Sequence, residues 1–169
     1  YIATFKPAKT LVYLSDVAKL EWAWHQLYSA RASNGIDYQQ LAEQFSSAGE
    51  KIIFQIPPGA TLLASPYPIH QIWAMNQDDY EGPETIQLPE NENFYYLIWR
   101  KELSMRIDLL QFTEWQILSW MAAEETIEKI SNKIEDLSTK IDFEIVLPEL
   151  VSRGWAAEFK IAEDECNEV

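Results

Sequence analysis

Residues with catalytic chemistry are few and scattered in this sequence. Its two histidines, His25 and His70, stand apart, and neither has a second His or Cys at the spacing of a metal site. The single cysteine, Cys166, lies among acidic neighbours, which disfavour the reactive thiolate. The sequence contains neither a phosphate-binding glycine loop nor a nucleophile elbow. These observations favour a binding protein over an enzyme that acts alone.

Paired carboxylates are the remaining candidates for chemistry, since two adjacent acids can bind a hard metal ion or act as an acid–base couple. The pairs are Asp78-Asp79, Glu124-Glu125 and Glu135-Asp136. Adjacent side chains on a helix diverge by about 100°, so such a pair does not converge on one ligand. A solvated surface is the simpler interpretation, and we expect no metal, cofactor or catalytic residue in this chain.

The composition is that of an acidic chain that can form a hydrophobic core. The 169 residues are 47% hydrophobic and include 27 acidic and 13 basic residues, for a net charge of −14. Nucleic acids and anionic membranes attract Lys and Arg, so neither is expected as a partner. No apolar run reaches the roughly 18 residues of a membrane span. A single cysteine excludes an internal disulfide, and we expect a cytoplasmic protein.

The segment Phe94–Leu110 predicts two strands joined by a charged turn. In its first run both alternating sets of residues are apolar, which indicates a strand covered on both faces. The second run alternates polar residues with four apolar ones: Leu103, Met105, Ile107 and Leu109. Such a strand can lie at a sheet edge, where its unpaired backbone groups accept a further strand.

Before this central hairpin, the pattern predicts a helical region with a second hairpin. A helix is expected over residues 11–31, with Ser15 as its N-cap. A second helix is expected after Asp37, which can cap it. Residues 51–64 are expected to form a hairpin that turns at Pro58-Gly59, because that dipeptide suits a type II turn.

After the central hairpin, the sequence predicts three helices and a short wing strand. The second helix runs from about Thr126 to Ile134. The third, Asp142–Arg153, contains Pro148, which would kink it or divide it in two. Gly154 can end this helix, and residues 155–161 can form the wing.

Two strands followed by three helices and a wing form a winged-helix-like order of elements. We therefore expect an α+β chain in which residues 1–93 form a helical region with a hairpin. This region would pack on residues 94–169, a winged-helix-like domain with a small antiparallel sheet.

A winged-helix-like domain can bind DNA or a peptide, and the charges favour a peptide. Before Arg153, the third helix carries no positive charge that could contact a phosphate, although a DNA-binding regulator stays open as the alternative. An extended peptide could pair with the open strand and contact the apolar side of the helix. The candidate peptide-binding residues are Leu103, Met105, Ile107, Leu109, Phe143, Val146, Leu147 and Leu150.

Three blocks of sequence carry a family resemblance. They are Leu14-Ser15-Asp16-Val17-Ala18-Lys19-Leu20-Glu21-Trp22-Ala23-Trp24, then Ser65-Pro66-Tyr67-Pro68 with Ile72-Trp73 and Asn76, then Leu97-Ile98-Trp99-Arg100. Together they resemble the accessory subunits MbnC, BufC and HvfC over roughly residues 5–160. From Phe94 onward, the order of elements also resembles the PqqD-type peptide-recognition domain. Many family members carry a further helical domain upstream, and its absence here resembles the MbnC branch.

The resemblance implies a function without an active site in this chain. Members of the family partner a DUF692-type multinuclear non-haem iron oxidase (MbnB-like), so iron would belong to the partner. The oxidase modifies cysteines of a ribosomal precursor peptide (MbnA-like) to oxazolone and thioamide groups, as in methanobactin copper-chelator biosynthesis. Residues 1–93 would dock the oxidase, with Trp22 and Trp73 as candidate interface residues, and residues 94–169 would bind the leader peptide.

Overall fold

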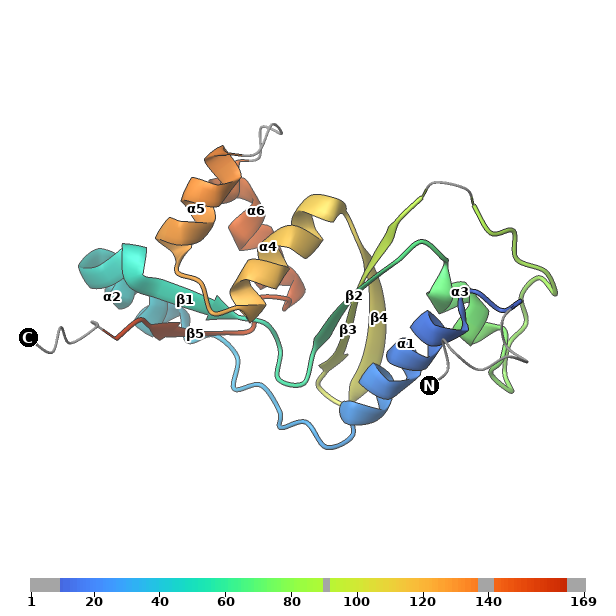
Figure 1. Cartoon of the computed structure of the whole chain (residues 1–169). Coiled ribbons are helices and arrows are strands. Elements are labelled where there is room, and N and C mark those ends of the chain that lie inside the picture. The colour runs from blue at the N-terminus through green and yellow to red at the C-terminus, as the bar shows by residue number, and fades with distance from the viewer. Residues whose placement is uncertain (1–9, 90–91, 137–141, 164–169) are drawn as a thin grey trace, which may run out of the picture. The chain divides into compact units, whose positions relative to one another are not determined.

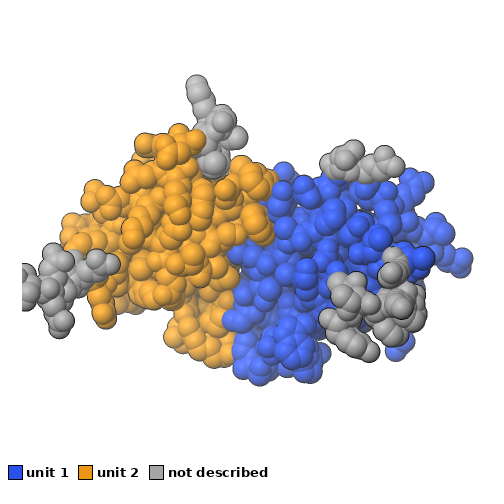
Figure 2. Space-filling model, in the orientation of Figure 1, with its two compact units in different colours: residues 1–30, 59–111 blue, residues 31–58, 112–169 orange. Residues whose placement is uncertain are grey.

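The computed structural model describes residues 10–89, 92–136 and 142–163. Within these ranges the chain is mixed α+β, as predicted, with six α-helices and two small antiparallel sheets (Figure 1). It divides into two compact units, which Figure 2 draws in different colours. Unit 1 comprises residues 1–30 and 59–111, and unit 2 comprises residues 31–58 and 112–169.

Unit 1 consists of a three-stranded antiparallel sheet and two helices. The sheet has the strand order β2 (Thr61–Ser65), β3 (Phe94–Lys101), β4 (Ser104–Leu110). The helices are α1 (Leu14–Gln26) and α3 (Ile69–Ala74). The core of the unit joins one side of α1 to α3 and to β3, and its buried residues are Val17, Leu20, Ala23, Leu27, Ile69, Ile72, Tyr96 and Ile98.

A side chain of β3 fixes the segment that follows α1. The Arg100 guanidinium of β3 donates hydrogen bonds to the carbonyl oxygens of Leu27 and Ala30, at 3.0 and 2.6 Å. Gly59 approaches the same place with a φ of +75°, and a Cβ on it would lie 2.4 Å from the Cβ of Ala30. Only glycine combines this backbone angle with this close approach.

The predicted central hairpin is confirmed. β3 and β4 pair in register from Tyr95↔Leu110 to Lys101↔Ser104, and the intervening turn has two residues. Both alternating sets of β3 are buried, Tyr96 and Ile98 on one face and Leu97 and Trp99 on the other. The first run is therefore covered on both faces, as its apolar composition predicts.

Unit 2 consists of four helices and a two-stranded sheet. The helices are α2 (Tyr38–Ala48), α4 (Phe112–Ala122), α5 (Ile127–Glu135) and α6 (Phe143–Arg153), and a 3-10 turn, η3 (Gly49–Lys51), follows α2. Strand β1 (Ile52–Gln55) pairs with β5 (Glu158–Ile161), the predicted wing strand. Three side chains cap helices at their N-termini by accepting backbone N–H groups, as Asx and Thr residues do: Asp37, Thr126 and Asp142.

The predicted hairpin over residues 51–64 is wrong. β1 pairs with β5, in the register Ile52↔Ile161, and β2 pairs with β3, in the register Leu62↔Leu97. The turn at Gly59 does form, but it separates strands of two different sheets. Ser15 is also not a cap, since Tyr13 occupies the N-cap position of α1 without a side-chain bond.

The observed division of the chain differs from the expected boundary between residues 93 and 94. That boundary falls inside unit 1, because β2 pairs with β3 across it. The two strands and three helices of the expected winged-helix-like order likewise belong to different units, with β3 and β4 in unit 1 and α4, α5 and α6 in unit 2.

The structure bears on two further expectations. Among the described residues, no helix combines the length and the hydrophobicity needed to cross a membrane. Cys166, considered above as a nucleophile, lies outside the described residues.

Candidate peptide-binding edge and surrounding sites

The open edge of β4 is the strongest candidate for a binding site. β4 is the last strand in the order β2-β3-β4, and among the described residues no strand pairs with its outer side. In a hairpin closed by a two-residue turn, the two residues that flank the turn exchange backbone hydrogen bonds. Hydrogen-bonded and non-hydrogen-bonded residue pairs then alternate along the two strands. Lys101↔Ser104 is that first pair.

This alternation determines which backbone groups of β4 face outward. Counting from the turn, the non-bonded partners on β4 are Met105, Ile107 and Leu109. Their N–H and C=O groups point away from β3, so three consecutive alternate residues present donors and acceptors along the edge. These are three of the four residues that the sequence pattern predicts for peptide binding on this strand.

The side chains of the four predicted strand residues have different surroundings. Met105 and Ile107 pack against the core of unit 1. Leu109 is 55% exposed, and Leu103 is 96% exposed because it lies in the turn rather than in β4. A peptide along this edge would thus find two side chains fixed by the core and a free apolar side chain at either end.

On the other face of β4, polar side chains fix the strand to β3. Asp108 accepts a hydrogen bond of 2.6 Å from the indole N–H of Trp99. Its second carboxylate oxygen lies 3.8 Å from the Arg106 guanidinium. The bond between Trp99 and Asp108 links the two strands, and neither contact involves the outward backbone groups of the edge.

The predicted helical half of the site lies in unit 2. Phe143, Val146, Leu147 and Leu150 all belong to α6, which continues through Pro148 as one helix. Leu150 is buried, Phe143 and Val146 are half-buried, and Leu147 lines an apolar groove described below. The eight predicted peptide-binding residues are therefore divided equally between the two units.

The two predicted interface tryptophans differ in exposure. Trp22 is 63% exposed, on the side of α1 that faces away from the unit 1 core. Trp73 is half-buried, packs against that core and lies with its ring centroid 4.8 Å from that of Trp24. Trp22 is thus available to a partner, whereas Trp73 is largely a packing residue.

An exposed aromatic row continues from Trp22 and was not predicted. His25 follows one turn later and Tyr28 one turn after that, with ring centroids 6.1 Å apart at each step. Tyr28 is 68% exposed. The spacing of three residues was visible in the sequence, where it marks one helix face.

The three sequence blocks of the family resemblance meet in unit 1. Asp16 of the first block accepts a 2.9 Å hydrogen bond from the hydroxyl of Ser65 in the second, and that hydroxyl accepts the N–H of Tyr67. Trp24 and Trp73 join the same two blocks. Arg100 of the third block binds the carbonyls that follow α1. The three blocks therefore pack together in the core of unit 1.

In unit 1, the half-buried His70 is hydrogen-bonded to the buried Tyr96. The Tyr96 hydroxyl donates to the Tyr67 carbonyl at 3.2 Å, so it accepts from Nδ1 of His70 at 3.1 Å. Burial lowers the pKa of His70 and raises the pKa of Tyr96. Both groups are neutral at pH 7, and their hydrogen bonds are structural.

Tyr96→Phe tests this assignment. The variant keeps the ring in place but removes the hydroxyl from the His70 Nδ1–H and from the Tyr67 carbonyl. We expect the free energy of unfolding to fall by about 1–3 kcal/mol, measured by urea denaturation. A variant as stable as the wild type would show that water replaces the hydroxyl and that the bonds contribute little.

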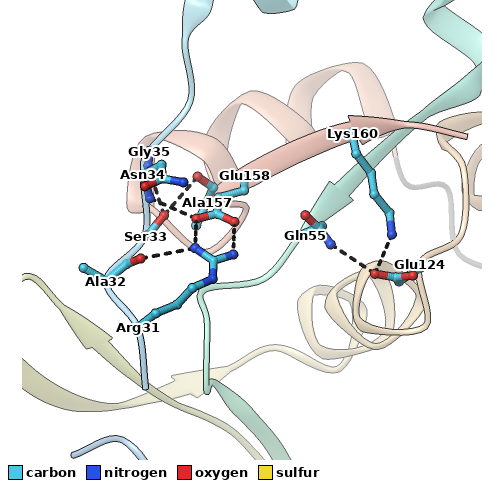
Figure 3. A network of polar contacts seen from close by, with 10 residues as sticks. All are labelled: Arg31, Ala32, Ser33, Asn34, Gly35, Gln55, Glu124, Ala157, Glu158 and Lys160. Carbon is cyan, nitrogen blue, oxygen red and sulfur yellow. Dashed lines mark hydrogen bonds and ion pairs between the residues drawn. The ribbon is translucent and has the colours of Figure 1, made fainter. Parts of the chain in front are cut away.

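In unit 2, a bidentate ion pair fixes β5 to the segment before α2. The Arg31 guanidinium donates to both carboxylate oxygens of Glu158, at 2.7 and 2.5 Å, and the Asn34 N–H donates to one of them at 2.9 Å (Figure 3). The hydrogen bonds from Arg31 lower the pKa of Glu158 to about 2. The same two-stranded sheet has a second polar contact, in which Glu124 accepts hydrogen bonds from Lys160 of β5 and Gln55 of β1.

The lowered pKa of Glu158 predicts a pH dependence of stability. Its contribution is complete above the unfolded pKa, near 4.5, and is lost as the pH falls through about 2. We expect Glu158→Gln to lower the free energy of unfolding at pH 7 by about 1–3 kcal/mol, with the difference narrowing between pH 4.5 and pH 2. Denaturation at several pH values measures this, and a difference independent of pH would exclude the ion pair as its cause.

Among the described residues, no three His, Cys, Asp or Glu side chains form a group that could hold a metal ion. Comparisons of the chain with protein-family models, with curated proteins and with solved structures gave no match.

Proposed function

We propose that this chain is a non-catalytic accessory subunit that presents a ribosomal precursor peptide to a multinuclear iron oxidase. The chain would form a heterodimer with a DUF692-type (MbnB-like) oxidase in the cytoplasm, and the iron would belong to that partner. The precursor's cysteines would be converted there to oxazolone and thioamide groups, as in methanobactin-type copper chelators. This proposal comes from the family resemblance together with the site described above.

The observation that carries the proposal is the open edge of β4. Three outward-facing backbone amides on a rigid hairpin suit an extended leader segment that adds as a further strand. More specifically, we propose that the leader is bound by a winged-helix-like recognition domain of the PqqD type, with α6 as its third helix. Such binding would raise the effective concentration of the cysteines at the oxidase, since a tethered reaction replaces a bimolecular encounter.

Charge supports a peptide rather than DNA as the ligand. The only basic side chain of α6 is Arg153, and its guanidinium is bound to Glu114, at 3.1 Å, and to Glu149. A DNA-binding regulator would need free Lys or Arg side chains on this helix. We therefore expect no binding to duplex DNA near physiological ionic strength, and salt-dependent binding there would revive that alternative.

Hydrogen exchange tests the proposal directly. The leader of the precursor encoded beside the oxidase gene would be added to the full chain, and amide exchange would be followed residue by residue. We expect new protection at Met105, Ile107 and Leu109 and little change at Ser104 and Arg106, whose amides already face β3. Protection confined to other elements would remove β4 from the site.

A further inference from the structure

Unit 2 contains an apolar groove that lies apart from the β4 edge and shares only Leu147 with the predicted peptide-binding residues. It has a volume of about 370 Å³ and runs between α2 and α6, over the β1 residue Phe54. The other lining residues are Tyr38, Leu41 and Phe45 of α2 and Leu147, Pro148, Val151 and Ser152 of α6. Tyr38 and Phe45 are 66% and 45% exposed. Aromatic side chains that line an open groove in this way are typical of contact surfaces.

A polar hollow of about 470 Å³ lies around the beginning of the same helix. Asp37 and Gln40 line it from α2, Glu158 and Phe159 from β5, and Asn34, Gly35 and Ile36 from the segment before α2. Two carboxylates therefore face the hollow, and no Lys or Arg is among its lining residues. Arg31 offsets one of these charges through its ion pair with Glu158, which leaves the hollow net negative (Figure 3).

The groove and the hollow are neighbours. Consecutive residues of α2 divide between them, with Asp37 in the hollow and Tyr38 in the groove. Phe54 lines the groove and Phe159 lines the hollow, and the centroids of their rings lie 6.5 Å apart. A ligand that crosses the beginning of α2 can therefore occupy both.

We propose that this surface binds a peptide segment with an apolar side chain near a lysine or arginine. The apolar side chain would enter the groove between α2 and α6, where burial of its surface supplies affinity. The cation would enter the hollow, where the Asp37 and Glu158 carboxylates attract it. The site uses neither β4 nor Trp22, so it stands if the leader does not bind the β4 edge, although it shares Leu147 with the predicted peptide-binding residues.

Peptide titration of the isotopically labelled full chain, followed by amide NMR, tests the proposal. The probes are acetylated Gly/Ser dodecapeptides with one Leu and one Lys separated by one to four residues. The matched peptides replace Lys with Glu or Leu with Ala. We expect at least one Leu–Lys spacing to shift the amide signals of Leu41, Phe45 and Val151, and to bind at least about fivefold more tightly than its Leu–Glu match.

Two variants test the groove and the hollow separately. Phe45→Gln should weaken the best peptide at least about fivefold, because it removes an apolar wall of the groove. Asp37→Asn removes a charge from the hollow but can still cap α2, so it should abolish the preference for Lys over Glu. Ile145→Gln is the matched control, since Ile145 is a 67% exposed α6 residue outside both cavities and should change neither result.

Three results would overturn the proposal. The first is the absence of shifts at the groove residues with every peptide, and the second is equal binding of the Lys and Glu peptides. The third is a shift of the same signals with protein concentration in the absence of peptide, which would identify a second copy of this chain as the occupant.

Discussion

Replacing Ile107 with Pro is expected to weaken binding of the precursor leader at least about tenfold, a loss of about 1.4 kcal/mol or more. Proline cannot donate a backbone hydrogen bond, and the amide of residue 107 faces the open edge of β4 rather than β3. The substitution therefore removes an intermolecular donor without removing a bond of the hairpin. Isothermal titration of the leader into the variant measures the effect.

Two variants at Leu109 separate the loss of the backbone donor from the loss of side-chain packing. Ile107 packs against the core of unit 1, so its replacement also destabilises the protein. Leu109 has the same backbone orientation but a 55% exposed side chain. Leu109→Pro should weaken leader binding as Ile107→Pro does, whereas Leu109→Ala, which keeps the amide, should change it less than about threefold. Equal affinities for Leu109→Pro and Leu109→Ala would contradict pairing at this edge.

Replacing Trp22 with Ala is expected to weaken the complex with the iron oxidase by about 30-fold or more, roughly 2 kcal/mol. Trp22 is 63% exposed and begins the aromatic row with His25 and Tyr28. Large exposed aromatic side chains often supply most of the free energy of an interface. Because Trp22 contributes little to the core, the melting temperature of the isolated chain should stay nearly unchanged.

Two comparisons test whether the effect is specific to this row. Ile145→Ala removes an equally exposed apolar side chain of α6 and should leave the affinity for the oxidase unchanged. Trp73→Ala should lower the stability of the isolated chain, because Trp73 packs against Trp24 and the core. An unaltered affinity of Trp22→Ala in surface plasmon resonance would place the oxidase on another surface.

Local features of the fold were predictable from sequence because their causes are local. Asp37 caps α2 through its carboxylate, and Gly154 ends α6 with a φ of +81°, as the residue types require. The central hairpin was visible because the strands and the turn are contiguous. The alternation of residues in β4 was compatible with an edge strand, and β4 is the last strand in the sheet that the described residues form.

The partners of the remaining strands were not predictable because they are distant in sequence. β1 pairs with β5, so Ile52 lies opposite Ile161, and no local pattern identifies such a pair. The division into two units is a consequence of this pairing and of that between β2 and β3. The continuity of α6 through Pro148 was also not predictable, because a proline inside a helix can kink it or divide it. In the structure Pro148 lines the groove with Leu147 and Val151.

The groove and the hollow beside α2 were equally invisible in the sequence. Phe45 and Val151, or Asp37 and Glu158, come together only through the fold. Sequence reasoning found Leu147 as a candidate contact but could not place it in a groove with α2.

Reconstitution with the oxidase tests directly whether modification of the precursor peptide requires this chain. The untagged chain would be coexpressed with a tagged DUF692-type oxidase and the precursor peptide encoded beside it, and the purified complex would be analysed for iron and for the mass of the peptide. We expect a stable complex whose iron belongs to the oxidase, and a loss of mass at the precursor's cysteines only when this chain is present. An oxidase that modifies the peptide equally well without this chain would contradict this expectation.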